Sequence, residues 1–257
     1  MPFFELWDDS EMESVMQDEN WDQRTVQLLG DEACARLRCA RVLVVGLGGV
    51  GATAAEMLCR AGVGHLTLVD GDCVRSSNIN RQLPALHSTV GKPKIDIVAD
   101  RLLDINPECD LVRIPEFLRD ARTSEVLDYG FDYVADAIDT LSPKVHLIAE
   151  CVDRGVPIVS SMGAGGKVDP AQIHISDLKH SRHCKLARVL RKRLRKLGVH
   201  GGPAVVFSTE TVPEDAVIRV DEQNKKSTLG TISYIPVIFG CCLASVIVRG
   251  IVQTREK

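Results

Sequence analysis

The sequence predicts an α/β fold with a Rossmann-like, mostly parallel sheet and helices on both faces. A C-terminal extension carrying a basic helix and additional strands is expected to follow. Apolar runs alternate with helical segments as far as Ser160, the pattern of parallel strands joined by right-handed crossovers. A glycine-rich turn follows the first apolar run. The composition, 45% hydrophobic and 26% charged over 257 residues, excludes disordered, collagen-like and coiled-coil chains.

The first expected strand, at 41–46, contains a continuous apolar run, which is typical of a strand buried on both faces. The expected helix at 92–105 places Ile95, Val98 and Leu102 on one side and stops before Pro107. Further strands are expected at 65–70, 109–114, 133–138 and 156–160. Further helices are expected at 31–37, 50–61, 124–129 and 143–154.

The pattern changes after Ser161. The sequence predicts a turn at 163–166, strands at 172–176 and 205–208, a basic helix at 184–197 and a polar stretch at 210–227. The apolar segment 235–248 is short for a membrane span and contains Pro236 and Gly240, so we expect a buried terminal helix. We expect an acidic N-terminal segment (1–20) and a single domain (21–257).

The charge and cysteine content indicate the compartment. The formal net charge is −4 and there are nine cysteines, with no Cys-x-x-Cys pair. Most of the cysteines lie in apolar segments, as free thiols do in a reducing compartment. The N-terminus lacks the basic start and apolar run of a signal peptide. We expect a cytoplasmic protein without stable membrane association.

A nucleotide site is predicted where the first strand meets its helix. Gly46, Gly48, Gly49 and Gly51 allow a tight turn and close approach of a phosphate to backbone N–H groups. Asp70 ends the second strand, where its carboxylate can accept hydrogen bonds from ribose hydroxyls. This pairing indicates a site for an adenine nucleotide, and NAD is the ligand most often found at such a motif. The alternative is a tight strand–helix turn that binds no ligand.

Cations beyond the ribose-binding strand favour ATP. Arg81 and Lys94 suit a triphosphate better than a dinucleotide, whose pyrophosphate the helix amides largely satisfy. Taken singly, each could also be a solvated surface cation. Asp136 and Asp139 bracket the end of the fourth strand. Asp139 can hold Mg²⁺ on the phosphates, or simply cap the next helix.

Five sequence motifs of this chain resemble those of a known family. GLGGVG, LVDGD, SNINRQ, VGKPK and DAIDT, in this order and spacing, resemble the ubiquitin-activating-enzyme-like adenylyltransferases from about Trp21 to Val248. Within that superfamily the chain most resembles the tRNA threonylcarbamoyladenosine dehydratases, through segments such as RQLPALHSTVGKPK, SSMGAGGKVDP and LARVLRKRLRKLG. The resemblance implies ATP and Mg²⁺ as cofactors, tRNA as substrate and a homodimer.

The resemblance also implies roles for individual residues. Arg24, Arg81, Lys94 and Asp139 would be catalytic, with Asp139 also the metal ligand. Arg24 would reach the phosphates from the partner subunit, although its segment departs from the family at Trp21 and Gln23. The nucleotide would be held by Gly46, Gly48, Gly49, Gly51, Asp70, Asp72, Ser77, Asn78, Arg81, Gln82, Lys94, Asp139 and Thr140.

The closest rivals are the adenylyltransferases that activate ubiquitin-like sulfur carriers. Those commonly carry two Cys-x-x-Cys pairs, which this chain lacks. A thioester would need an exposed cysteine of lowered pKa. Cys184 is the only candidate, and a cysteine without chemistry is the more common case. A nucleotide-binding adaptor without catalysis also stays open.

The basic helix indicates a polyanionic substrate. Residues 185–196 contain seven of the chain's 31 Lys and Arg residues and no acid. At 100° per residue, Arg188, Arg191, Lys192 and Arg195 share one face. Leu186, Leu190, Leu194 and Leu197 share the opposite face. Buried leucines and projecting cations suit a helix that follows phosphates, so these four cations are the expected tRNA-binding residues. A solvated amphipathic helix is the alternative.

Overall fold

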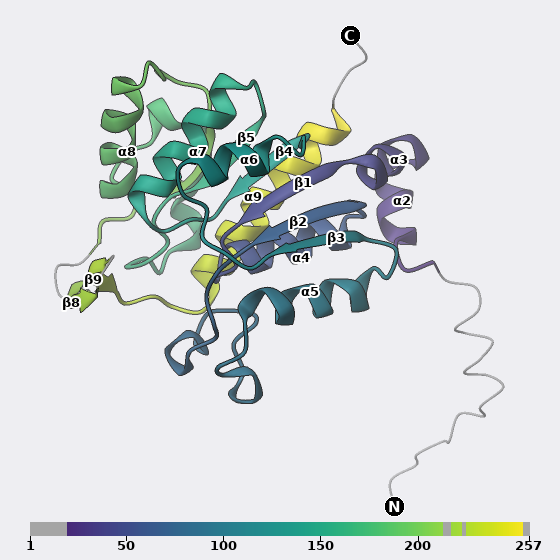
Figure 1. The fold of residues 1–257 in the computed structure, drawn as a ribbon, viewed down its shortest axis with the longest axis horizontal. Helices are drawn as coiled ribbons and strands as arrows, with labels where there is room; N and C mark the ends of the chain where they lie inside the picture. The colour runs from purple at the N-terminus through teal and green to yellow at the C-terminus, as the bar shows by residue number, and fades with distance from the viewer. Residues whose placement is uncertain (1–19, 213–216, 223–224, 254–257) are drawn as a thin grey trace, which may run out of the picture.

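The computed structural model describes residues 20–212, 217–222 and 225–253. They form a seven-stranded sheet of order β3-β2-β1-β4-β5-β7-β6, in which only β6 runs antiparallel (Figure 1). The strands are β1 (Arg41–Val45), β2 (His65–Val69), β3 (Asp110–Ile114), β4 (Tyr133–Asp136), β5 (Ile158–Ser161), β6 (Ile173–Asp177) and β7 (Ala204–Ser208). The predicted fold class is confirmed.

Helices cover both faces of the sheet because both faces are apolar. The helices are α2 (Gln23–Leu29), α3 (Asp31–Cys39), α4 (Gly51–Arg60), α5 (Lys94–Ile105), α6 (Ala121–Leu127), α7 (Leu141–Asp153), α8 (Lys185–Lys196) and α9 (Tyr234–Val252). Val42 and Val44 of β1 pack into the core under α3, α4, α5 and α9. Leu43 and Val45 face the core under α6, α7 and α8.

The strand order reverses between β1 and β4, which are direct neighbours. Val45 pairs with Val69 of β2 on one side and with Asp136 of β4 on the other. The three strands therefore end level, and the segments that follow them meet at one edge. In open α/β sheets ligands bind at this kind of reversal, beyond the carboxyl ends of the strands.

Two elements differ from the expectations. Helix α2 precedes α3, where only one short helix is expected. The polar stretch expected at 210–227 contains β8 (Val217–Glu222) and the first part of β9 (Lys225–Leu229), and these two strands form a hairpin. Polar and apolar residues do not alternate regularly over 217–229, so this segment gives little strand signal in the sequence. Most of the acidic segment expected at 1–20 lies outside the described residues.

Helix α9 packs along α4 inside the fold. A side chain at Gly240 would meet the Val50 carbonyl oxygen at 2.5 Å and the Thr53 Cβ at 2.7 Å, so the two helices are in backbone contact there. Ile235, Phe239 and Leu243 are fully buried. Among the described residues, α9 is the one helix long and apolar enough to cross a membrane, and 44% of its most apolar window is buried in the chain.

Candidate active site

The glycine-rich turn is shaped by contact with the loop after β4. Gly46 has φ +90°, and a Cβ there would lie 2.9 Å from the carbonyl oxygen of Ala137. A Cβ on Gly51, where α4 begins, would lie 1.7 Å from the carbonyl oxygen of Gly46. No side chain fits at either position, so the turn is tight and its backbone approaches the β4–α7 loop closely. The N-terminus of α4 is thereby set at the strand-order reversal, where its free N–H groups can bind phosphate.

Asp70 follows β2 and is fixed beside this turn. Its Oδ2 accepts a hydrogen bond from the Leu47 backbone N–H at 2.6 Å, and its Oδ1 accepts one from the Asp72 N–H at 2.7 Å. Burial raises the pKa of this carboxyl, and the two amide hydrogen bonds partly offset that rise. The carboxylate retains acceptor capacity for ribose hydroxyls.

The predicted phosphate-binding cations lie around the same turn. Lys94 begins α5 with its side chain 6% exposed, and its Nζ is 2.9 Å from Asp72 Oδ2. Arg81 is held by its own segment, because its Nη1 donates to Ser77 O at 2.9 Å and Asn80 Oδ1 at 2.8 Å. Its backbone carbonyl oxygen is 2.7 Å from the Cβ position of Gly49. Both cations are therefore placed before any nucleotide binds.

Two amides complete this side of the crevice. Asn78 is buried, and its Oδ1 accepts the Arg75 N–H at 3.1 Å. Gln82 lies against the turn, with its Nε2 3.7 Å from the Cβ position of Gly48. The buried Gln82 Oε1 has no hydrogen-bond partner among the described residues. A buried acceptor without a partner is costly, so this oxygen fits a site that a ligand or water completes.

Asp139 and Thr140 lie in the loop between β4 and α7, directly after Ala137 and Ile138, whose backbone approaches Gly46 of the glycine-rich turn. Asp139 is exposed, and Thr140 takes the N-cap position, so Asp139 is not the cap of α7. The described residues contain no cluster of three or more His, Cys, Asp or Glu side chains suited to a metal ion. A single carboxylate beside a phosphate site still fits Mg²⁺, which commonly binds one or two carboxylates together with substrate phosphates and water.

Asp136 does not face this crevice. Its side chain is fully buried and contacts Lys144 and Ser160, which are also fully buried. The sequence placed Asp136 beside Asp139 at the strand end but gave no sign of its partners, because Lys144 comes from the first turns of α7 and Ser160 from β5.

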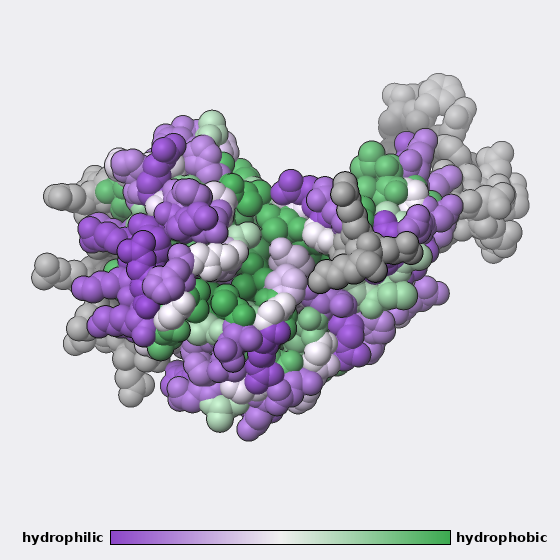
Figure 2. Space-filling model, turned by 90° about the horizontal axis from the view of Figure 1, so that it is seen from above, coloured by the Kyte–Doolittle hydropathy of each residue, from purple (hydrophilic) through white to green (hydrophobic). Residues whose placement is uncertain are grey.

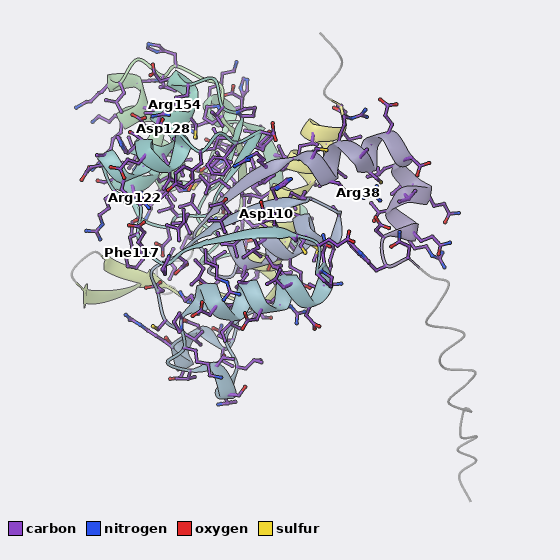
Figure 3. The ribbon with its side chains drawn as sticks, turned by 45° about the vertical axis from the view of Figure 1, so that its right-hand side comes forward. Arg38, Asp110, Phe117, Arg122, Asp128 and Arg154 are labelled. Carbon is purple, nitrogen blue, oxygen red and sulfur yellow. The ribbon has the colours of Figure 1, made fainter. Side chains whose placement is uncertain are left out.

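Arg24 does not join the site of its own chain. It is a residue of α2, and α2 and α3 lie at the amino ends of β1 to β3 (Figure 1). Arg38 of α3 pairs with Asp22 at 2.8 Å at that end. Figure 3 shows Arg38 far from Phe117, which lies beyond the carboxyl end of β3. Arg24 therefore lies at the opposite end of the sheet from the glycine-rich turn.

Phe117 is a residue at the edge of the site that the sequence did not indicate. It is 55% exposed, and its ring carbons come within 2.9 Å of the Cβ position of Gly71, directly after Asp70. The ring thus occupies the space that a side chain at Gly71 would take. An exposed aromatic ring beside a ribose-binding carboxylate offers an apolar surface at the mouth of the crevice.

Helix α8 presents most of its cations to solvent. Arg188, Lys192 and Arg195 are exposed, whereas Leu190 and Leu194 are buried. Figure 2 shows hydrophilic residues covering the side of the molecule that carries α7 and α8. Arg193, which is not among the four expected tRNA-binding cations, donates from Nη1 to Ser142 Oγ at 3.0 Å. The basic helix therefore contacts the first turn of α7, close in sequence to Asp139.

Two predictions on α8 need correction. Arg191 does not project with the other cations, because its Nη1 donates to Leu178 O at 3.2 Å and Ser181 O at 2.7 Å. It anchors the segment before α8. Leu197 is 58% exposed, because the helix ends at Lys196 and Leu197 lies past its last turn.

Cys184 is the N-cap residue of α8. Its Sγ accepts a hydrogen bond from the Ala187 N–H at 3.5 Å, and the residue is half-buried. A capping sulfur satisfies one of the free amides at a helix start. The geometry therefore gives this cysteine a structural role.

The site combines a glycine-rich turn, a buried carboxylate, two anchored cations and an exposed aspartate, and comparison with known proteins shows the family of the chain. The model of the ThiF family matches residues 22–257. The chain belongs to the ThiF family. A tRNA threonylcarbamoyladenosine dehydratase of Bacillus subtilis is 46% identical over 193 residues, which are 75% of each chain.

Two further known proteins are similar to this chain to different extents. A crystal structure of the Escherichia coli tRNA N6-threonylcarbamoyladenosine dehydratase in complex with ATP has a TM-score of 0.81, 33% sequence identity and 96% coverage of both chains. The Escherichia coli molybdopterin-synthase adenylyltransferase is 40% identical over 131 residues, which are 51% of each chain. This ThiF-family chain thus resembles the dehydratases over most of its length and the molybdopterin-synthase adenylyltransferase over half of it.

Proposed function

We propose that this protein is an ATP-dependent dehydratase that cyclises threonylcarbamoyladenosine in tRNA. The observation that carries the proposal is the crevice at the strand-order reversal, in a chain similar to such dehydratases along three quarters of its length. The glycine-rich turn would bind the phosphates of ATP, and Asp70 would bind its ribose.

The reaction has two steps. The threonyl carboxylate attacks the α-phosphorus of ATP, which forms an acyl-adenylate and expels pyrophosphate. A nitrogen or oxygen of the carbamoyl group then attacks the activated carbonyl, which closes the ring, releases AMP and loses one proton. Because both reacting groups belong to one nucleoside, the second step is unimolecular and needs no covalent bond to the enzyme.

Lys94 and Arg81 stabilise charge on the phosphates in this scheme. Lys94 is anchored on Asp72 and Arg81 on the Ser77 carbonyl oxygen, so little reorganisation is needed when ATP binds. Gln82 Oε1, which has no partner among the described residues, would accept a hydrogen bond from the bound nucleotide or an ordered water.

Mg²⁺ is the cation that the site fits. Asp139 would hold it, with the remaining coordination from phosphate oxygens and water. When bound, the ion supplies charge neutralisation on the phosphates.

The working form in this proposal is a homodimer in the cytoplasm. Helix α9 exposes an apolar stripe, with Tyr234 42% and Val237 39% exposed and Cys241 also open to solvent. A second copy is the occupant we propose for it, because Arg24 can serve a phosphate site only in another chain.

Mixing two inactive variants tests the dimer. Arg24→Ala and Lys94→Ala homodimers should each be inactive, whereas a mixture that exchanges subunits should regain part of the wild-type rate, because one site of each heterodimer has both native residues. No recovery after demonstrated exchange would contradict a shared site.

The tRNA would lie along α8. Arg188, Lys192 and Arg195 are exposed on the helix, and Arg193 contacts Ser142, three residues after Asp139 in the sequence. Phosphate contacts along this helix would position the modified nucleoside over the adenylation site.

The second candidate is an adenylyltransferase for a ubiquitin-like sulfur carrier. It is favoured by the similarity to the molybdopterin-synthase adenylyltransferase, which covers half of the chain. A measurement of pyrophosphate release from ATP distinguishes the two candidate functions. For the dehydratase, release should be stimulated by tRNA that contains threonylcarbamoyladenosine and not by unmodified tRNA. Stimulation by a carrier protein alone would favour the second candidate.

A further inference from the structure

The most completely buried ionic group in the described part of the chain lies directly behind the β4–α7 loop. Asp136, Lys144 and Ser160 have no exposed surface. Lys144 Nζ is 2.6 Å from Asp136 Oδ2 and 3.0 Å from Ser160 Oγ. Ser160 Oγ donates to the same Asp136 Oδ2 at 2.6 Å. We refer to these three residues as the buried triad.

A buried ion pair is poor evidence for stability, because desolvation of both charges offsets most of their attraction. Apolar residues of similar size would fill this space at no greater cost. The triad is also not needed to bring the strands together, since β4 and β5 already pair along the ladder from Val134 to Asp136. A role other than stabilising the fold would therefore explain better why two charged residues and a serine occupy this buried position.

The second carboxylate oxygen indicates that role. Asp136 Oδ1 accepts a hydrogen bond from the backbone N–H of Ile138 at 3.0 Å. Ile138 immediately precedes Asp139, in the loop whose Ala137 carbonyl oxygen contacts the glycine-rich turn at Gly46. One carboxylate therefore joins the interior of the sheet to the loop that carries the proposed metal ligand. Lys144 and Ser160 hold its other oxygen and fix its rotamer.

We propose that Asp136, Lys144 and Ser160 are positioning residues that set the β4–α7 loop, and with it Asp139, for binding of the ATP–metal complex. For the role of Asp139 the inference rests on the proposed function. The fixing of the loop by the triad stands on the hydrogen bonds alone. All three residues are fully buried, so the role that we propose for them is positioning and not catalysis.

Two combined variants separate positioning from packing. The amide variant, Asp136→Asn with Lys144→Met, removes both charges but keeps an amide oxygen for the Ile138 N–H and an NH₂ group for Ser160. The apolar variant, Asp136→Leu with Lys144→Met and Ser160→Ala, fills the same space with apolar groups and leaves the Ile138 N–H without an acceptor. Both variants avoid an unpaired buried charge, which is the usual reason that such sites fail to fold.

Three measurements are made on each variant: ATP affinity with Mg²⁺ and with EDTA, hydrogen exchange of the peptide containing 137–140, and the thermal midpoint. The apolar variant should exchange faster in this peptide and bind ATP with Mg²⁺ about thirtyfold more weakly, as removal of one buried hydrogen-bond acceptor implies. Its affinity in EDTA should change little. The amide variant should stay within about threefold of wild type in each affinity.

Glu56→Gln is the matched control. Glu56 is another buried carboxylate, on α4, paired with Arg60 and Arg101 away from the loop. This variant should alter the thermal midpoint but neither the Mg²⁺-dependent affinity nor the exchange of 137–140. Ser160→Ala alone removes the two hydrogen bonds that Ser160 Oγ makes with Lys144 and Asp136 but keeps the ion pair. It should show the same effects as the apolar variant at smaller size, and it covers the case in which that variant does not fold.

Unchanged exchange of 137–140 in a folded apolar variant or in Ser160→Ala would overturn the inference. Wild-type affinity for ATP with Mg²⁺ in those variants would do the same. If Asp139→Ala leaves that affinity unchanged while the triad variants still loosen the loop, the metal role in the proposed function fails and the positioning of the loop stands.

Discussion

Asp139 is the residue on which the proposed adenylation depends most directly. It is exposed in the loop that contacts the glycine-rich turn. Asp139→Asn should lower the rate of pyrophosphate release by about a thousandfold or more, roughly 4 kcal/mol in the transition state, because the phosphates lose their metal anchor. The fold should persist, since the side chain is at the surface.

Asp153→Asn, at the far end of the adjoining helix α7, is the control for this variant. It should keep the wild-type rate and thermal midpoint. Pyrophosphate release by Asp139→Asn at the wild-type rate, with modified tRNA present, would remove the proposed metal role.

Cys184 separates a direct cyclisation from a covalent mechanism. Its sulfur caps α8, and serine is a better N-cap than cysteine, so Cys184→Ser should preserve the helix. Turnover should stay within about threefold of wild type, well under 1.4 kcal/mol in the transition state, because the proposed ring closure uses no thioester. A decrease beyond about a thousandfold, with the thermal midpoint unchanged, would indicate a covalent step.

At the residue scale, the sequence predicted the crevice through its motifs but not its supports. Glycines at a strand–helix turn and an aspartate after the next strand can be identified because their spacing along the chain is fixed by the βαβ unit. Ser160 and Lys144 could not be linked to Asp136 in this way, because their contact depends on side chains from three elements that meet inside the sheet. Arg191 was misplaced because helical periodicity shows which face a residue lies on, and not whether a carbonyl group lies within its reach.

The elements with a clear apolar pattern were predicted within a few residues of their bounds. Strand β1 has a continuous apolar run and helix α5 a periodic one, and such patterns specify both the type of element and its place in the sequence. Helix α2 contributes no fully buried residue. Its Leu28 is apolar but exposed, so the apolar positions of this segment do not mark a buried helix face. Such a helix is defined by its contact with α3 and not by its own pattern.

Glu56 of α4 pairs with Arg101 of α5, and the stability that this pair contributes depends on pH. Burial raises the pKa of its carboxyl, but hydrogen bonds from Arg101 and Arg60 outweigh burial and leave the pKa below its ordinary value. The unfolded chain therefore binds this proton more readily. The stabilisation is fully present above the unfolded-state pKa and is lost as pH falls through the lower folded-state pKa.

Glu56→Gln should accordingly lower the free energy of unfolding at pH 7 by about 1–3 kcal/mol. Chemical denaturation across the acid range checks the sign. The difference between wild type and variant should shrink as the pH falls below the ordinary glutamate range. A difference that is constant with pH would show that the ion pairs contribute nothing through this carboxylate.

At the scale of the whole molecule, an acidic chain concentrates cations on one helix. The formal net charge is −4, yet α8 contains no acid. Replacing Arg188, Lys192 and Arg195 together by Glu should weaken tRNA binding and lower the log–log salt slope by about 0.7–0.9 for each phosphate that the helix no longer binds. Arg191 is left in place because it anchors the segment before α8. ATP affinity should be unchanged.

The control replaces Arg113, Arg122 and Arg154 by Glu, which gives the same change in net charge. These three lie on β3, on α6 and directly after α7, and they form ion pairs at the surface, which contribute little to stability. Figure 3 labels Arg122 and Arg154. Equal tRNA affinity and salt slope in the two triple variants would make α8 an ordinary solvated face.

Mass spectrometry of tRNA nucleosides after incubation with the protein and ATP tests the central claim most directly. The predicted result is conversion of threonylcarbamoyladenosine into a nucleoside lighter by one water molecule, with one AMP and one pyrophosphate formed per ring closed. The conversion should require ATP and should be abolished by Asp139→Asn. An unchanged nucleoside after incubation with folded protein that binds ATP would contradict the proposed function.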